Sequence, residues 1–417
     1  DLVYIVKKEE DIMKKFNKFL SVAVASAMVM AMAGCGNTDN GSAATGTNAA
    51  TESAAASDSA ASGSVFKIGG IGPTTGGAAV YGLAVQHGAE IAVEEINAAG
   101  GINGYQVEFK FQDDEADAEK SVNAYNALKD WGAQIIDGST TSGACIAVTD
   151  KTKEDNMFQI TPSGSAVECV QYDNNFRVCF SNPNQGLASA QYIGENGLAE
   201  KIAVIYDSSD VYSSGIYEKF AKEAENQPFE IVAAEAFTAD NKTDFSVQLQ
   251  KAKDAGADMV FLPIYYQESA LILTQAAAMG YAPKWFSCDG MDGILGGVDN
   301  FDVSLTEGVM LLTPFAADAT DDLTQSFVTK YKEKYGDTPN QFAADSYDAI
   351  YVIKAAIEKS GVTPDMSVSD ICDGMKAAMT EITVDGLTGS GMTWTADGEA
   401  NKAPKAVVIE NGAYKAM

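Results

Sequence analysis

The sequence has one histidine, few basic residues and no long apolar run, and each scarcity excludes a class of protein. A lone His87 cannot build a metal site from several histidines. Acidic residues outnumber basic ones by 58 to 28, and the formal charge of −30 repels phosphate backbones, which argues against nucleic-acid binding. There is no GxxxxGK[ST] motif of a P-loop ATPase and no CxxC pair typical of zinc sites. We therefore expect no cofactor, no metal and no nucleic-acid partner.

The N-terminal region has the layout of an export signal. Lysines follow Met13, an apolar stretch extends from Phe19 to Met32, and small residues lead to Cys35. The stretch is too short for a comfortable bilayer span, and the order of basic, apolar and small residues is that of a cleavable signal. Residues 31–35, Ala-Met-Ala-Gly-Cys, resemble the lipobox of bacterial lipoproteins, in which the cysteine is lipidated after cleavage. An ordinary signal peptide with an incidental cysteine is the alternative.

A change in composition separates this leader from a folded region. Residues 36–64 consist almost entirely of Gly, Ala, Ser, Thr, Asn and Asp, so they cannot build a core and are expected to form a flexible tether. We predict an over-extended start over 1–12, a lipoprotein signal peptide over 13–34, and lipidated Cys35 with its linker over 35–64. The fold then begins at Val65, outside the cytoplasm, on the extracellular face of the cell membrane or in the periplasm.

Five cysteines follow Cys35, and an odd number cannot all pair within one chain. They are Cys145, Cys169, Cys179, Cys288 and Cys372. Cys169 and Cys179 are close enough in sequence to flank a hairpin and form a bridge. Alternatively, all five are buried thiols, which behave as small hydrophobic residues. The sequence leaves both possibilities open.

Strand-like and helix-like segments alternate in two successive sets. The first set has predicted strands over Phe66–Gly72, Val107–Gln112, Gln134–Asp137 and Met157–Thr161, and helices over Leu83–Ala99 and Ser121–Trp131. The second has strands over Lys201–Tyr206, Glu230–Phe237, Met259–Pro263 and Lys284–Cys288, and helices over Gly215–Glu225, Val247–Ala255 and Ala270–Met279. Repeated βα units imply parallel sheets with helices on both faces, and two sets imply two lobes.

The C-terminal part has too few strands for a sheet of its own, so we expect it to complete these two lobes. Long helices are predicted over Leu323–Tyr335 and Gln341–Ser360, and short strands near Met392–Thr395 and Ala406–Ile409. The predicted fold class is α/β, with two Rossmann-like lobes, each a mainly parallel sheet with helices on both faces.

The loops after the strands are the candidate site, because open α/β sheets bind ligands beyond the carboxyl ends of their strands. In the first set they place small hydroxyl residues at helix starts, which suits a carboxylate or phosphate. In the second set they contain tyrosines and one carboxylate. Hydroxyls at helix starts are usually N-caps when taken singly, so their co-location is the stronger signal. Together the loops suit a zwitterion with an apolar side chain, because each buried charge is paired.

One segment carries a specific family resemblance. It is Glu94–Gly104, EEINAAGGING, followed by the acidic pair Asp113-Asp114. Further matching segments are Phe66–Gly69, Tyr81-Gly82, Gly88–Ala92, Ile160–Pro162, Asp244–Ser246 and Tyr347–Ala349. From Val65 to its end the chain therefore resembles the leucine/isoleucine/valine-binding family of ABC-transporter substrate-binding lipoproteins, with the type I periplasmic binding protein fold. The resemblance implies a multi-strand hinge, with lobe 1 over 65–183 and 313–388 and lobe 2 over 184–312 and 389–417.

The resemblance also implies which residues touch the ligand. In the family a hydroxyl residue after the third strand binds the ligand carboxylate, and an acidic residue before a glycine meets the ammonium; Thr141 and Asp289 stand at these places. The implied ligand-binding residues are Tyr81, Thr141, Ser142, Ser163, Gly164, Ser165, Tyr212, Tyr265, Asp289 and Gly290. Asp289 is one methylene shorter than the glutamate common in the family, and Ser163 and Gly164 replace small alanines, so leucine specificity is left open.

The function implied is that of an extracytoplasmic solute-binding protein of an ABC importer. It would capture a small zwitterionic ligand, an amino acid that is branched-chain or related, by hinge closure and deliver it to the permease subunits. We expect a monomer that contacts the membrane through its lipid anchor only, and not an enzyme. The alternative ligands are an amide, urea, a short peptide or an aromatic acid. A sensory ligand-binding module is a further alternative.

Overall fold

The computed structural model describes residues 63–417, which lie within one compact unit. The predicted leader, Cys35 and all but the last two residues of the predicted linker lie outside the described residues. The first strand begins at Phe66, next to the predicted start of the fold. Among the helices of residues 63–417, none combines the length and the apolar content that crossing a bilayer requires.

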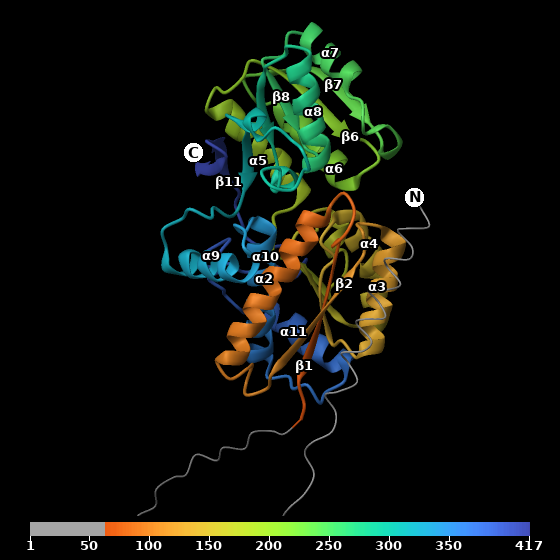
Figure 1. Ribbon diagram of the computed structural model, residues 1–417. Helices are drawn as coiled ribbons and strands as arrows, with labels where there is room; N and C mark the ends of the chain where they lie inside the picture. The colour runs from red at the N-terminus through yellow and green to blue at the C-terminus, as the bar shows by residue number, and fades with distance from the viewer. Residues whose placement is uncertain (1–62) are drawn as a thin grey trace, which may run out of the picture. The chain divides into compact units, whose positions relative to one another are not determined.

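The N-terminal sheet has five parallel strands in the order β2-β1-β3-β4-β5. They are β1 (Phe66–Gly72), β2 (Val107–Asp113), β3 (Ile135–Asp137), β4 (Phe158–Thr161) and β5 (Asn175–Arg177). Ile68 and Ile135 share a core with α2 (Ala79–Ala98) and α10 (Gln341–Ser360), with α11 (Val368–Met379) packed on α10. Ile71 and Ile136 share another core with α3 (Ala118–Trp131) and α4 (Ser142–Asp155). Helices therefore cover both faces of this sheet (Figure 1).

The second sheet has seven strands in the order β12-β11-β10-β9-β8-β6-β7. They are β6 (Lys201–Asp207), β7 (Glu230–Phe237), β8 (Met259–Leu262), β9 (Lys284–Ser287), β10 (Met310–Thr313), β11 (Lys405–Glu410) and β12 (Ala413–Ala416). Only β11 runs antiparallel to both of its neighbours; the strands from β10 to β7 are parallel. The covering helices are α5 (Asn182–Glu195) and α6 (Val211–Ala224) on one face, and α7 (Ser246–Asp254) and α8 (Tyr266–Ala278) on the other.

Within residues 63–417 the chain passes three times between the two sheets, which is the predicted multi-strand hinge. The passages lie between β5 and α5, between β10 and α9 (Asp322–Tyr335), which contacts α2, and before β11. Trp394 Nε1 donates to the β5 carbonyl of Arg177 at 2.7 Å, and Lys402 Nζ donates to the carbonyl of Val178 at 3.2 Å. Residues up to Lys402 thus pack on lobe 1, and we propose that the last lobe boundary follows Lys402 instead of residue 388.

The predicted strand near Met392–Thr395 is wrong. The backbone there makes only isolated bridges, Val384 to Met392 and Trp394 to Ala400. Met392 and Trp394 are both buried, so their spacing of two residues produced a strand-like pattern. The strand-like alternation of apolar residues arises because an irregular segment packs both side chains on the same hydrophobic core.

Candidate functional site

Loops of both lobes enclose a narrow cavity at the carboxyl ends of the parallel strands. Its lining residues are Tyr81, Thr140, Thr141, Ser142, Ser163, Tyr212, Tyr265, Asp289, Gly290 and Phe342. Eight of the ten predicted site residues are among them. Gly164 and Ser165 are not, and two lining residues, Thr140 and Phe342, escaped the sequence analysis. The structure therefore brings the predicted site together from segments up to about two hundred residues apart.

The lobe 1 wall of the cavity is the N-terminus of α4. Ser142 Oγ accepts hydrogen bonds from the backbone N–H groups of Ser165 at 3.2 Å and Ala166 at 3.1 Å, so it ties this helix to the loop after β4. The hydroxyls of Thr141 and Ser165 are buried and have no partner among the described residues. Buried polar groups are normally satisfied, and these two lie where the positive end of a helix favours an anion.

Gly164 and Ser165 shape this wall from behind. The Gly164 N–H donates to Thr161 Oγ1 at 2.7 Å, so it is not free for a ligand. A Cβ on Gly164 would lie 2.7 Å from that oxygen, which explains why the position has no side chain. The fully buried Arg177 donates to the carbonyls of Gly164 at 3.2 Å and Ala166 at 2.9 Å and fixes the loop. Arg177 was not found from the sequence, because nothing in its local pattern distinguishes it from a strand residue.

The lobe 2 wall is built around the carboxylate of Asp289, which is 4% exposed. It accepts hydrogen bonds from the Tyr212 hydroxyl at 2.6 Å and from Gln185 Nε2 at 3.0 Å. Burial raises the pKa of Asp289 to about 7, although these two hydrogen bonds act against the shift. The two hydrogen bonds therefore fix the position of the carboxyl group but compensate its negative charge only in part. A cation beside it would be strongly favoured.

Aromatic rings line the cavity between these two walls. Tyr81 of α2 reaches across to lobe 2, where its hydroxyl donates to the carbonyl of Gly290 and accepts from the N–H of Tyr266 at 3.2 Å. Its ring centroid lies 4.3 Å from that of Phe342 and 5.6 Å from that of Tyr265. Tyr212 stacks on Tyr265 at 4.9 Å. These rings supply apolar surface and exclude water from the groups that would hold the ligand.

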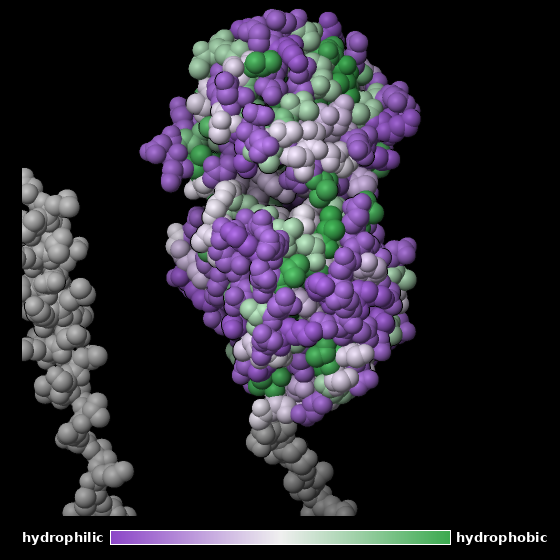
Figure 2. All heavy atoms as spheres, turned by 90° about the vertical axis from the view of Figure 1, so that its right-hand side faces the viewer, coloured by the Kyte–Doolittle hydropathy of each residue, from purple (hydrophilic) through white to green (hydrophobic). Residues whose placement is uncertain are grey.

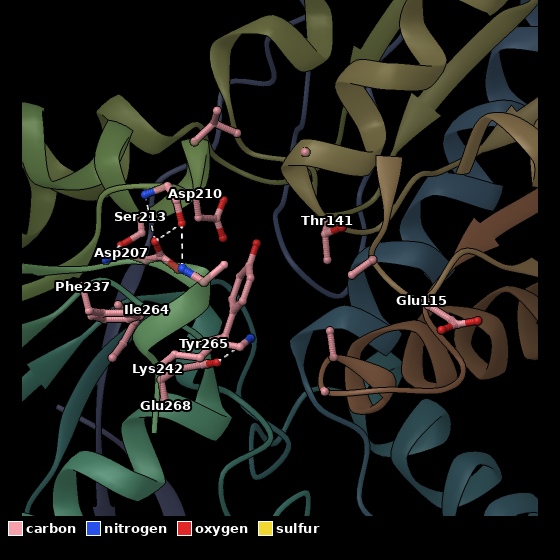
Figure 3. Close-up of a pocket in the computed structure, with 17 residues that line it drawn as sticks. Glu115, Thr141, Asp207, Asp210, Ser213, Phe237, Lys242, Ile264, Tyr265 and Glu268 are labelled. Atoms are coloured by element: carbon pink, nitrogen blue, oxygen red, sulfur yellow. Dashed lines mark hydrogen bonds and ion pairs between the residues drawn. The ribbon is translucent and has the colours of Figure 1, made fainter. Parts of the chain in front are cut away.

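A larger cavity of about 370 Å³ adjoins this one and shares Thr141 and Tyr265 with it (Figure 3). Its remaining charged lining residues are Glu115, Asp207, Asp210, Lys242 and Glu268. Lys242 Nζ lies 3.0 Å from the Glu268 carboxylate. In Figure 3 the labelled residues of lobe 2 lie on the opposite side of the open space from Thr141. The two cavities therefore share one wall residue from each lobe.

The five cysteines of the described residues are all free and buried. Cys169 and Cys179 are therefore not bridged, and the alternative of buried thiols is the one that the structure supports. Cys169 Sγ instead lies 3.6 Å from the carbonyl of Ser142 and packs in a small cluster with Cys145 and Ala166.

Comparisons with known proteins find the same fold and related sequences. A family model described as periplasmic binding protein matches residues 65–413. The Leu/Ile/Val-binding protein homolog 3 of Brucella melitensis is 30% identical over 300 residues, which cover 72% of this chain and 80% of that protein. The leucine-, isoleucine-, valine-, threonine- and alanine-binding protein of Pseudomonas aeruginosa is also 30% identical, over 302 residues covering 71% and 78%.

Solved structures give a matching result. The branched-chain amino acid transporter substrate-binding protein of Streptococcus pneumoniae, solved with isoleucine, has a TM-score of 0.76 and 28% identity, covering 84% of this chain and 98% of that one. A solute-binding protein of an ABC transporter from R. palustris, solved with benzoate, has a TM-score of 0.74 at 19% identity, covering 85% and 95%, and supports the fold alone. These homologues are solute-binding proteins of transporters and not enzymes.

Proposed function

Because the chain belongs to the periplasmic binding proteins, within the branched-chain amino acid ABC transporter family, we propose that it captures an amino acid outside the cytoplasm and delivers it to an ABC permease. The resemblance seen in the sequence is confirmed, as is the α/β fold with two lobes. The ligand, a branched-chain or related amino acid, and the import role are the proposed part. A monomeric state and lipidation at Cys35, which would hold the protein at the membrane surface, belong to the same proposal.

One observation supports the proposal more than the others: one wall of the narrow cavity suits an anion, and the facing wall suits a cation. The buried hydroxyl of Thr141, the N-cap residue of α4, has no partner among the described residues, which suits a carboxylate. Asp289 on the facing wall is buried and lacks a cation among the described residues, which suits an ammonium. The α-carboxylate and α-ammonium of an amino acid meet both needs at once. An aromatic acid has no ammonium and would leave Asp289 uncompensated.

Hinge closure follows from the same contacts. The ligand's two charged groups would be held by different lobes, so binding stabilises the closed arrangement over the open one. Tyr81 already joins the lobes through its hydrogen bonds to Gly290 and Tyr266, and it would help to hold the lobes together beside the ligand. We propose that the permease recognises this closed arrangement.

A thermal-shift screen tests the proposed ligand class. The chain would be heated with each of the twenty amino acids, with benzoate and with urea. A ligand present at a hundredfold its Kd adds about 2.7 kcal/mol to the free energy of unfolding, which raises Tm by a few degrees. We expect a rise with at least one apolar amino acid and none with benzoate or urea. A rise with benzoate and with no amino acid would contradict the proposal.

Amino-acid binding is also expected to release a proton. In the unliganded protein the Asp289 pKa is about 7, so near pH 6.5 the carboxyl is mostly protonated, and an ammonium beside it favours the ionised form. Binding should therefore tighten as the pH rises from about 5.5 to 8. Isothermal titration at pH 6.5 in buffers of different ionisation enthalpy should show release of a substantial fraction of one proton. Proton uptake, or affinity independent of pH, would contradict this assignment.

The unliganded protein should show the opposite pH dependence in its stability. Because the pKa of Asp289 is raised in the folded state, this side chain binds more protons in the folded than in the unfolded state between pH 4 and 7. Asp137, also buried, has a pKa raised to about 7 by desolvation and acts in the same direction. The contribution of these groups to stability is therefore largest at low pH and is lost as the pH rises through about 7. Urea unfolding across this range measures it.

A further inference from the structure

A further cavity of about 490 Å³, called the second cavity below, lies beside the narrow site and shares no lining residue with that site or with the 370 Å³ cavity. Lobe 1 contributes Val80 on α2 and the segment before α10, and lobe 2 contributes the loop after β9 and the turn into β12. Residues close in sequence line different cavities. Tyr81 and Asp289 line the narrow site, whereas Val80 and Asp292 line the second cavity. A volume of this size is typical of small-molecule sites.

Asp292 is the buried charge of this second cavity. It is 4% exposed, and its Oδ2 accepts from the N–H of Gln341 at 2.9 Å, a contact that joins the two lobes. No hydrogen-bond donor among the described residues is aligned on its Oδ1, and the neighbouring Gln341 Oε1, also buried, has no donor either. Burial raises the pKa of Asp292 to about 6, opposed by the N–H of Gln341 and the nearby hydroxyl of Tyr414. The Asp292 carboxyl group, whose Oδ1 has no partner among the described residues by distance and angle, therefore lies in the wall of the cavity with no cation beside it.

The described side chains do not supply a cation to Asp292. Lys332 and Lys415 line the cavity but are exposed, and Lys415 Nζ pairs with Asp318 at 3.4 Å. The cavity is also lined by apolar and aromatic side chains, those of Val80, Leu295, Phe315 and Tyr414. A bare metal ion needs several oxygen ligands, whereas an ammonium group needs acceptors and tolerates aromatic faces. The chemistry therefore fits an organic ammonium with an apolar body.

From this geometry we infer that the cavity is a second binding site, which takes a small organic ammonium ion whose charged group pairs with Asp292. Its apolar body lies against Phe315, Leu295 and Tyr414. The site is independent of the amino-acid site in its contacts but is joined to it through one turn, η3 (Asp289–Met291), because the Asp292 N–H donates to the carbonyl of Asp289 at 2.8 Å. Both lobes form its walls, so an occupant favours the lobe arrangement that closes the cavity.

The test uses n-butylammonium chloride as the probe. All titrations are made on the full chain carrying Asp289→Asn, so that the probe meets no buried carboxylate in the narrow site. Amide ¹H–¹⁵N NMR spectra should shift at Gly293, Asn340 and Tyr414 as the probe is added. Addition of Asp292→Asn, which keeps an oxygen acceptor for Gln341, should weaken the apparent Kd at least tenfold. Sodium chloride at equal ionic strength and the neutral isostere 1-butanol are the controls, and neither should reproduce the shifts.

A second variant guards against a local effect of Asp292→Asn on folding. Gly296 lines the cavity, has no positive φ, and a Cβ there would meet no atom within 4 Å, so Gly296→Leu fills the space without a backbone clash. It should also abolish the butylammonium shifts while leaving Asp292 in place. The inference is overturned if the shifts persist in either variant, if sodium chloride produces them equally, or if the probe causes no shift at these amides.

Discussion

Replacing Asp289 by alanine is expected to weaken amino-acid binding by a factor of about thirty to several thousand. Loss of one partner of a buried, hydrogen-bonded charge pair typically costs 2–5 kcal/mol, and here the ligand ammonium is the partner left without a counter-charge. The change also leaves the Tyr212 hydroxyl and Gln185 Nε2 without their acceptor inside the cavity. The lost hydrogen bonds affect the free and the bound protein alike, whereas the lost charge pairing acts only in the bound state, so the loss of affinity should appear mainly as faster dissociation.

Isothermal titration with the amino acid that gives the largest thermal shift measures this loss. Thr141→Ala removes one neutral donor to the carboxylate, so we expect a smaller loss of about ten- to a hundredfold. Asp299→Ala, at an exposed carboxylate ten residues further along the chain, is the matched control and should bind like the parent. Equal affinity of the parent, the Asp289 variant and the Thr141 variant would refute the site.

Replacing Lys402 by methionine is expected to lower the free energy of unfolding by about 3–5 kcal/mol, the usual cost of removing one partner from a buried ion pair. The Lys402 side chain is 1% exposed, and its Nζ lies 2.6 Å from Asp345 Oδ1 and 2.5 Å from Thr388 Oγ1. Burial already raises the pKa of Asp345 despite the ammonium beside it. Without Lys402 this carboxyl would be buried with no cation, next to the last passage of the chain between the lobes.

Urea unfolding of the unliganded protein tests this prediction. Combining Lys402→Met with Asp345→Leu should recover much of the loss, because replacing both members of a buried pair by apolar groups is often nearly neutral. Lys354→Met is the control: Lys354 pairs with Glu358 at 2.7 Å on the surface of α10, and exposed pairs contribute at most about 1 kcal/mol. A loss for Lys402→Met no larger than that for Lys354→Met would contradict the role assigned to the buried pair.

The strands and long helices could be predicted because each buries a regular face. The bounds of β1, β7 and α10 agree with the sequence prediction, since their apolar spacing is uninterrupted. Three helices begin four residues earlier than predicted: α2 starts at Ala79 instead of Leu83, α6 at Val211 instead of Gly215, and α8 at Tyr266 instead of Ala270. Their first turns face the cavities and carry site residues, so the apolar period is absent there. Departures from the pattern thus mark the functional ends of these helices.

Parts of the site were predictable because parallel strands place their carboxyl ends together. Tyr81, Thr141 and Asp289 each follow a strand that the sequence reveals. Gln185 and Phe342 do not: Gln185 lies within the first turns of α5, and Phe342 belongs to α10, about two hundred residues after Thr141. Their approach depends on how helices pack on the sheets, and no local pattern records it. Asp292 was missed because a carboxylate in a glycine-rich loop has the pattern of an ordinary turn residue.

The three passages of the chain between the sheets impose an order on its maturation. Lobe 1 lacks α10 and α11, and lobe 2 lacks β11 and β12, until the last quarter of the sequence is present. A nascent chain therefore holds two half-built cores with exposed apolar faces until its C-terminal strands arrive. Under the proposed extracytoplasmic location this order would suit export, because both lobes stay incomplete until the last segments are made.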